Sequence, residues 1–442
     1  MLSTISPAQC PNQATTHNLL TALQLIKTGA ATAIDLIHQY FDRIDQREAD
    51  VGAWQYRLSR ADYLLQYEAR RAFYEQSLLK GLPVAIKDII DTAGMPTEMG
   101  SPIHTGRQPV DDATCVELLQ RAGAIVLGKT VTTEFAYFKP GKTRNPADLN
   151  RTPGGSSSGS AAAVADGMVP IALGSQTAAS VIRPAAFCGT IGYVGSRGEY
   201  SLRGIQPLAQ SLDSLGLFAQ KVEDIQLLRA ILLRSTWQTT TPQRPARILV
   251  CRGEQVGTTD AAMNTAMDTL CSRLRKQGVE LIELQDNGAI GQMVEHHIRI
   301  MAWEVCRNLA RESRYSDLLS QPLHQLMRDG LAMPREDYLQ SLQAADNTRQ
   351  WLWNTYNNVD AILAPAAAGI APEGQHATGA PHMSRPWQAM GLPVITLPGL
   401  KDEQGLPLGI QLIGQPHQDD QLLNTAAWIE QRHIYGDLTE AV

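Results

Sequence analysis

Apolar residues recur every three or four positions in the first part of the chain. Residues 16–29 follow this spacing and end in Gly29, a residue type that commonly follows the last turn of a helix. Residues 32–49 and 59–76 show the same spacing. The pattern therefore predicts a helical segment over residues 15–78, which packs on the outside of a core.

Further along, short apolar runs that are typical of strands alternate with longer segments of helical spacing. Residues 260–277 and most of 290–357 have helical spacing, and a last helix is expected from Asp419. The apolar runs that predict strands cover residues 84–90, 124–127, 246–253, 279–284, 360–365, 393–399 and 406–414. This alternation is typical of an α/β protein.

The stretch from Arg151 to Gly189 is almost uncharged and is dense in glycine, serine and alanine. Composition alone would favour a flexible linker. Its centre, AAAVADGMVPIALG, carries an apolar core that such linkers lack. We therefore expect a loop, a buried helix, a short strand and a second loop. Two polar turns, 154–159 and 175–180, would then be held at the ends of one buried unit.

Composition narrows the class of protein. The chain has 442 residues, 43% of them hydrophobic, so it can form two or three domains or one large α/β domain. The net charge of −6 does not indicate a nucleic-acid or membrane partner, and no run of 18 apolar residues predicts a membrane span. The N-terminus lacks the pattern of a signal peptide. The six cysteines form no CxxC pair or metal-like cluster, so they are expected to be reduced, mostly buried cytoplasmic thiols.

Two short motifs fit well-known sites but stand in the wrong context. Residues 123–130, GAIVLGKT, match the phosphate-binding pattern, yet their variable positions are themselves an apolar strand. Residues 155–159, GSSSG, match the nucleophile elbow of α/β-hydrolases, yet a proline-bearing loop precedes them instead of a strand. None of the ten histidines lies in the two serine-rich turns. A histidine-dependent esterase is therefore the weaker enzyme hypothesis.

Lys87 interrupts the apolar run 84–90, which is unusual because burying an ammonium group costs free energy. Taken alone, it fits a lysine of an edge strand that reaches the surface. The alternative is catalytic. A serine hydroxyl needs a base to become a nucleophile, and a lysine can serve where burial lowers its pKa.

Several ordered motifs resemble the amidase signature family of serine hydrolases. They are GLPVAIKDIIDTAG from Gly81, DDATCVELLQRAGAIVLGKTVTTEFA from Asp111, GGSSSGSAAAVADG with GSQTAASVIRPAAFCG, QSLDSLGLFAQKVED from Gln210, and GLPVITLPG with GLPLGIQLIG near the end. The resemblance covers residues 15–430 and is weak over 240–355. It implies one α/β/α domain over 1–442, with a central mixed sheet flanked by helices. The region 240–355 would then be the variable part that forms the substrate pocket.

The resemblance also implies the catalytic residues. Ser180 would be the nucleophile, Ser156 the bridging serine after a cis peptide bond from Gly155, and Lys87 the base. Their separations of 69 and 24 residues fit the order of the family. Each serine taken singly also fits an ordinary loop serine.

Two departures from the family pattern bear on the site. The backbone N–H groups of Thr177, Ala178 and Ala179 would form the oxyanion hole, but this chain has QTAAS where DTGGS is common. Arg183 follows Ser180 by three residues instead of two, which is similar to malonamidase, where the matching arginine binds a substrate carboxylate. A structural arginine that pairs with a carboxylate such as Asp213 is the alternative.

The sequence thus predicts hydrolysis of the C–N bond of a small amide, with an acyl-serine intermediate and release of ammonia or amine. A carboxylate-bearing amide is the favoured substrate, and no metal or organic cofactor is expected. One component of a tRNA-dependent amidotransferase and a catalytically silent binding protein remain alternatives, and a homodimer is left open. Residues 365–387 form a proline- and glycine-rich loop that is expected to cover the pocket. His297, Met301 and Trp303 are pocket candidates, although core packing also accounts for them.

Overall fold

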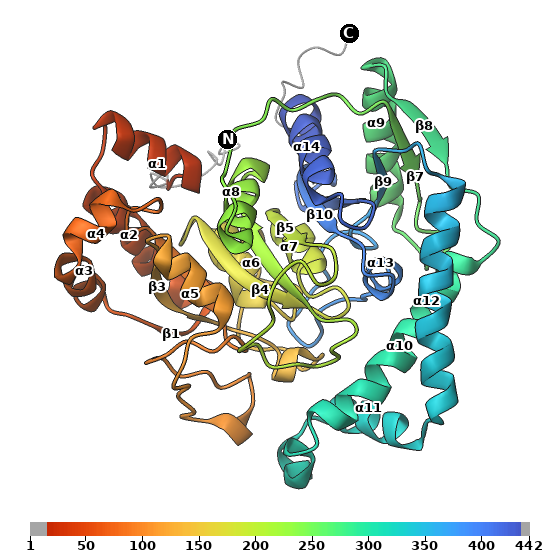
Figure 1. Cartoon of the computed structure of the whole chain (residues 1–442), viewed down its shortest axis with the longest axis horizontal. Coiled ribbons are helices and arrows are strands. Elements are labelled where there is room, and N and C mark those ends of the chain that lie inside the picture. The colour runs from red at the N-terminus through yellow and green to blue at the C-terminus, as the bar shows by residue number, and fades with distance from the viewer. Residues whose placement is uncertain (1–15, 435–442) are drawn as a thin grey trace, which may run out of the picture.

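One mixed sheet of eleven strands runs through the molecule (Figure 1). The computed structural model describes residues 16–434. The strand order is β1-β3-β2-β4-β6-β5-β10-β11-β9-β7-β8. The three strands β3, β2 and β4 are parallel, as are β9, β7 and β8, while the neighbours between and beside them are antiparallel. The strands are β1 Trp54–Arg57, β2 Pro83–Lys87, β3 Ile125–Thr130, β4 Ile171–Gln176, β5 Ile191–Val194, β6 Ser214–Ala219, β7 Arg247–Val250, β8 Glu280–Glu283, β9 Ala361–Pro365, β10 Val394–Lys401 and β11 Pro407–Ile413.

Helices flank the sheet, as an α/β/α fold requires. The α-helices are α1 Leu19–Thr28, α2 Ala33–Val51, α3 Arg60–Ala69, α4 Arg71–Gln76, α5 Thr114–Arg121, α6 Ser158–Ala165, α7 Ile182–Cys188, α8 Val222–Leu233, α9 Ala261–Lys276, α10 Ala289–Asn308, α11 Gln321–Ala332, α12 Arg335–Thr355, α13 Arg385–Ala389 and α14 Asp419–Ile429. The helices α6 and α7 pack on the central strands, and α5, α8 and α14 form a second group that packs together and on the sheet. The predicted α/β/α architecture is therefore confirmed.

The N-terminal helices begin and end at residues whose chemistry specifies a boundary. Thr32 caps α2 and shares a reciprocal capping box with Asp35, while Gly29 closes α1 in the left-handed conformation at φ 73°. The prediction that 15–78 is helical is wrong for β1, whose four residues pair antiparallel with β3. A strand this short has no readable alternation, and only its partner β3 specifies it.

The glycine- and serine-rich stretch folds as the sequence predicts, into a loop, a buried helix, a strand and a loop. These are α6, β4 and the turn that leads into α7, and nearly all of their side chains are buried. Small residues allow the close packing. A Cβ atom on Gly159 would lie 2.2 Å from the carbonyl oxygen of Ala53 and 2.5 Å from the nitrogen of Val131. The first turn of α6, which follows the serine loop, therefore packs directly on the backbone just after β3.

Replacing Gly159 with alanine is expected to destabilise the fold. The added methyl group meets backbone atoms that cannot rotate away, so overpacking costs about 1–3 kcal/mol or more. The denaturant midpoint of Gly159→Ala should fall clearly below that of the wild type. Ala165→Ser, at the half-buried end of the same helix, is the matched control and should change the midpoint little. Equal midpoints for Gly159→Ala and the wild type would contradict the close packing.

The residues 123–130 form a strand and its approach, and no glycine-rich cradle is present in them. Lys129 is completely buried in β3, where its Nζ donates hydrogen bonds to the Ile90 carbonyl and to Thr97 Oγ1. The rejection of a phosphate-binding loop is therefore confirmed.

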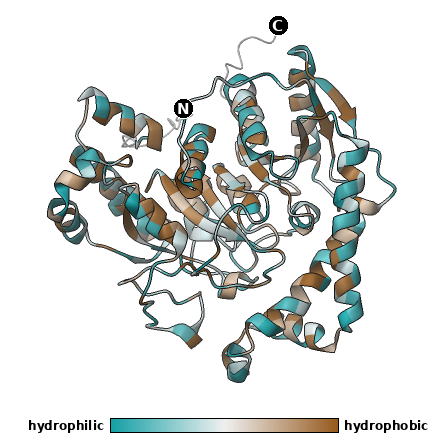
Figure 2. Ribbon diagram, in the orientation of Figure 1, coloured by the Kyte–Doolittle hydropathy of each residue, from teal (hydrophilic) through white to brown (hydrophobic). Residues whose placement is uncertain are grey.

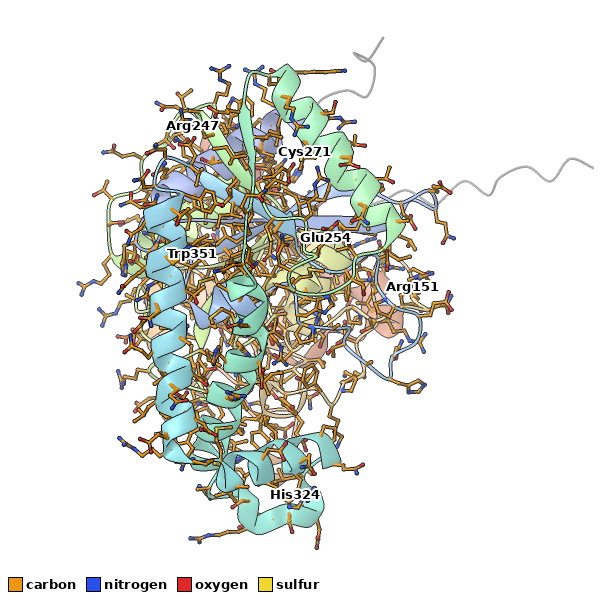
Figure 3. The ribbon with its side chains drawn as sticks, turned by 90° about the vertical axis from the view of Figure 1, so that its right-hand side faces the viewer. Arg151, Arg247, Glu254, Cys271, His324 and Trp351 are labelled. Carbon is orange, nitrogen blue, oxygen red and sulfur yellow. The ribbon has the colours of Figure 1, made fainter. Side chains whose placement is uncertain are left out.

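Three long helices, α10, α11 and α12, lie at one edge of the molecule (Figure 1). Hydrophilic and hydrophobic residues alternate along these three helices (Figure 2). His324 on α11 and Trp351 on α12 lie on this side (Figure 3). The helical prediction for most of 290–357 is confirmed. The sequence pattern did not predict the strands β5 and β6 or the helices α8 and α13.

All five cysteines of the described chain are buried and free of disulfide bonds, and Cys10 lies outside the described residues. Within residues 16–434 there is no helix long and apolar enough to cross a membrane.

Candidate active site

A cavity lies where the two serine-rich turns meet. It encloses about 330 Å³ of empty space, part of which opens to solvent. Its lining consists of Ala136, Tyr137, Phe138, Ser156, Thr177, Ala178, Ala179, Ser180, Arg183, Leu208, Met301, Thr378 and Pro381. A larger cavity between α1, α4 and α8 contains none of the predicted catalytic residues. The predicted serines, the oxyanion residues and Arg183 therefore share one small site.

Lys87 lies at the end of β2 and points toward the first serine turn. Its Nζ is 2.6 Å from Ser156 Oγ, 2.9 Å from Ser175 Oγ and 3.3 Å from the Ser175 carbonyl oxygen. The shortest of these contacts places Nζ within proton-transfer distance of Ser156 Oγ. The surface lysine considered from the sequence is ruled out, since the side chain has no exposed area.

Burial sets the protonation of this lysine. Removal of its ammonium from water holds the pKa of Lys87 well below its usual value, and the carboxylate of Asp213 acts in the opposite direction with a smaller effect. No carboxylate forms an ion pair with Lys87 among the described residues. This environment therefore favours the neutral amine over the ammonium.

Ser156 and Ser180 lie at facing turns of the buried unit. The peptide bond between Gly155 and Ser156 is cis, as the resemblance implies. The backbone N–H of Ser157 donates to the carbonyl of Ser180 at 3.2 Å, which ties the two turns together. Ser157 itself is fully buried with its hydroxyl on the Ser175 carbonyl, and it does not line the cavity. The elbow-like motif therefore does not present its central serine.

Three consecutive backbone N–H groups are available at the cavity. Those of Thr177, Ala178 and Ala179 make no hydrogen bond to any group in residues 16–434. Neither alanine has a positive φ, so the conformation of this turn does not require the glycines of the common pattern. Such a row of unpaired donors can stabilise a developing oxyanion.

Two polar residues whose role in this turn was not predicted hold it in place. Asp213 accepts a 2.5 Å hydrogen bond from the Thr177 hydroxyl, and burial raises the pKa of its carboxyl to about 7. Gln176 Oε1 accepts from the N–H groups of Val181 and Ile182 at 3.0 and 3.1 Å, which fixes the start of α7. Gln176 also donates a hydrogen bond, from its Nε2 to Gln388 Oε1 at 2.8 Å. The glutamine of the QTAAS motif was the one residue in the sequence that could have indicated these contacts.

The connection 366–384 closes one side of the cavity through Thr378 and Pro381. Arg151, labelled in Figure 3, anchors this connection by donating to the Ala371 carbonyl at 2.8 Å. The sequence placed a covering loop over 365–387, and the lining confirms its position. Its last residues are helical instead, because α13 begins at Arg385.

Comparison with known proteins identifies the family. The model of the family described as Amidase matches residues 35–423. The chain belongs to the amidase family. It is a hydrolase that acts on C–N bonds.

Relatives of known structure and sequence agree with this assignment. A glutamyl-tRNA(Gln) amidotransferase component from Anaeromyxobacter dehalogenans is 32% identical over 419 residues, which cover 82% of this chain and 85% of the relative. A crystal structure of an amidase superposes with a TM-score of 0.84 at 28% identity, over 94% of this chain and 100% of that one. The same amidotransferase component from Thermotoga maritima gives 0.79 at 25% identity, over 95% and 96%.

Arg183 of this amidase-family chain lies in the cavity and not against Asp213. Its Nη1 donates to the Gly379 carbonyl at 2.6 Å, and its Nη2 donates to the Gly155 carbonyl at 2.6 Å and to Thr378 Oγ1 at 3.0 Å. It makes no ion pair within residues 16–434. The alternative that it is a structural partner of Asp213 is therefore wrong.

The three pocket candidates of the region 240–355 have different positions. Met301 lines the cavity. His297 is buried behind it, with Nε2 2.7 Å from the Thr177 carbonyl oxygen. Trp303 stacks on Tyr338, away from the lining. Region 240–355 thus contributes to the site through α10.

Proposed function

We propose that this amidase hydrolyses a small primary amide with Ser180 as nucleophile, Ser156 as bridging serine and Lys87 as base. The observation that supports this most is the 2.6 Å contact between Lys87 Nζ and Ser156 Oγ at a cavity that also holds Ser180. Lys87 is buried and has a lowered pKa, so it is suited to take a proton.

The proposed reaction has two steps. Ser180 Oγ attacks the amide carbon while its proton passes to Ser156 and the proton of Ser156 passes to Lys87. The N–H groups of Thr177, Ala178 and Ala179 stabilise the negative oxygen. The C–N bond then breaks, Lys87 returns a proton through Ser156, and ammonia leaves. Water attacks the acyl-serine in the same way, so that the net change is amide plus water to carboxylate plus ammonium.

Ammonia release by the purified chain tests this function. Turnover of a small amide by this protein alone supports a free-standing amidase. Release of ammonia only from glutamine, or only with added partner proteins, would support a role within an amidotransferase. The Anaeromyxobacter relative is named for such a role. The absence of both turnover and labelling of Ser180 by a serine-reactive reagent would support a silent binding protein.

The proposal extends to substrate choice through Arg183, in the manner of malonamidase. Its guanidinium lies in the cavity, and its Nε is buried with no hydrogen-bond partner among the described residues. A substrate carboxylate matches the fork of a guanidinium. The proposed substrate is therefore a short molecule with an amide at one end and a carboxylate at the other, such as a dicarboxylic acid monoamide or a carboxylated urea.

Arg183→Ala is expected to lower kcat/KM for an acid-bearing amide by about ten- to hundred-fold, because a charged hydrogen bond contributes about 1.5–3 kcal/mol. The loss for a neutral amide of the same size should be small. Thr378→Val, which removes one hydrogen-bond partner of Arg183 and keeps the charge, is the control. Equal losses on both amides would make Arg183 structural, since it also binds two backbone carbonyls.

We also propose a single domain over residues 1–442. The eleven-stranded sheet supports it, because strands from both halves of the chain pair side by side without a break.

A further inference from the structure

A second arginine is buried beside the cavity. Arg385 begins α13, at the end of the connection 366–384, and its exposed fraction is 6%. Its contact with His297 Nδ1, at 3.4 Å from Nη1, is the only hydrogen bond of this guanidinium to another group of the described chain. A guanidinium has five N–H donors. Four of them therefore have no protein partner within residues 16–434.

Arg385 and Arg183 are two buried cations without a neutralising carboxylate. Neither forms an ion pair with an Asp or Glu of the described chain. Burial lowers the pKa of Arg183 to about 9, with a smaller effect from Arg385, and burial lowers the pKa of Arg385 itself to about 10. Both values stay above neutrality, so both groups are charged. Buried charges that lack a partner are costly, and proteins retain them mainly at functional sites.

The neighbours of Arg385 place its charge against the wall of the cavity. Tyr137, which lines the cavity, interacts electrostatically with it: the Arg385 charge opposes the rise that burial causes in the tyrosine pKa. His297 links Arg385 to the carbonyl of Thr177, another lining residue. Arg183 lines the same cavity from α7. Arg183 thus lines the cavity, and Arg385, which is not itself a lining residue, adjoins the cavity wall from the start of α13.

We propose that Arg385 is a second anion-binding residue, which together with Arg183 binds the carboxylate of the substrate. The inference rests on the proposed amide hydrolysis and narrows its substrate class to short anionic amides. A carboxylate has two oxygens with about four lone-pair positions, so it can accept hydrogen bonds from two guanidinium groups at once. The pair would also disfavour neutral amides, because binding one leaves two desolvated charges unpaired.

A purely structural role for Arg385 is the competing explanation. In that role it would only hold His297, and through it the oxyanion turn. The neutral ring of His297 fits this chain of contacts, since burial holds its pKa well below the usual value and Nε2 can donate to the Thr177 carbonyl. A single 3.4 Å contact leaves four donors available to a ligand, however, and the structural role does not use them.

Binding of malonate and succinate to the purified chain tests the inference without any turnover. Calorimetry should show that Arg385→Gln weakens the binding of these dicarboxylates about ten- to hundred-fold, while Arg385→Lys, which keeps the charge, loses less. Arg349→Gln is the matched control, because Arg349 donates to the Met390 carbonyl just beyond α13 and carries its own partner, Asp346. It should bind as the wild type does. If Arg385→Gln does not fold, Arg385→Met, which has a similar length and no charge, serves instead and should show the same loss of malonate affinity.

Kinetics separate anion binding from positioning of the oxyanion turn. For a monoamide acid such as malonamate, Arg385→Gln should raise KM about ten-fold or more, with a smaller change in kcat. For malonamide, the neutral diamide, kcat/KM should change less than about three-fold. Equal losses on the two substrates, or unchanged malonate affinity in Arg385→Gln, would overturn the inference. Lost malonate binding in a chain that releases no ammonia and shows no labelling of Ser180 would refute the proposed hydrolysis and leave the anion site standing.

Discussion

Ser180→Ala is expected to abolish turnover while the fold stays intact. The hydroxyl forms the bond to the acyl group in the proposed reaction, so the variant has no nucleophile for that step. Loss of a covalent nucleophile reduces kcat by at least about 10⁴-fold. Ammonia release measured on the purified variant checks this result, with circular dichroism as the test of folding.

Ser157→Ala is the matched control for the nucleophile. Ser157 lies in the neighbouring turn and is buried with its hydroxyl on the Ser175 carbonyl. Its loss should leave most of the activity. A serine-reactive phosphonate or sulfonyl fluoride should label Ser180, and mass spectrometry identifies the labelled peptide. Labelling at Ser157 would instead favour the α/β-hydrolase mechanism.

Lys87→Ala should lower kcat/KM by about 10³- to 10⁴-fold, because it removes the proposed base. Lys87→Arg should not restore activity, since a guanidinium stays protonated and cannot accept the Ser156 proton. Lys129→Met is the control, as Lys129 is an equally buried lysine on the next strand whose Nζ contacts Ile90 and Thr97 instead of Ser156. It should lower stability more than the rate of the folded enzyme. Near-normal rates for either Lys87 variant would refute the assignment.

The pH profile follows from the same lysine. Its amine is the base only when neutral, so activity is present above its pKa and is lost as the pH falls through it. Burial depresses this pKa, so the acid limb of kcat/KM should have its midpoint well below 10.5, the ordinary value for a lysine. A limb at the ordinary lysine value would show that Lys87 is charged near neutrality and does not act as the base.

Much of the fold was predictable because long elements carry a readable period. The helices α2, α10 and α12 and the core strand β4 have apolar residues at helical or strand spacing, and small residues predicted the close packing of α6. The strand β1 was missed because four residues at a sheet edge depend on their partner β3 more than on their own sequence.

The site was predictable to a different extent. Spacing and resemblance pointed to Lys87, Ser156 and Ser180, and in the structure both serines line one cavity while Lys87 contacts Ser156. From the sequence, Asp213 was only a candidate partner for Arg183. Its hydrogen bond with Thr177 could not be predicted, because the two residues are 36 positions apart in the chain. Arg385 gave no signal at all, because an arginine before a proline in a loop is ordinary until its burial is known.

The cavity draws its parts from two halves of the chain. Every group assigned to bond breaking lies between residues 87 and 180, whereas Met301, Thr378 and Pro381 enter the same cavity from beyond residue 290. Substitutions in the later half of the chain can therefore change the shape of the cavity while the residues assigned to bond breaking stay the same. Changes in α10 and the connection 366–384 can reshape the cavity in this way without touching Lys87, Ser156 or Ser180.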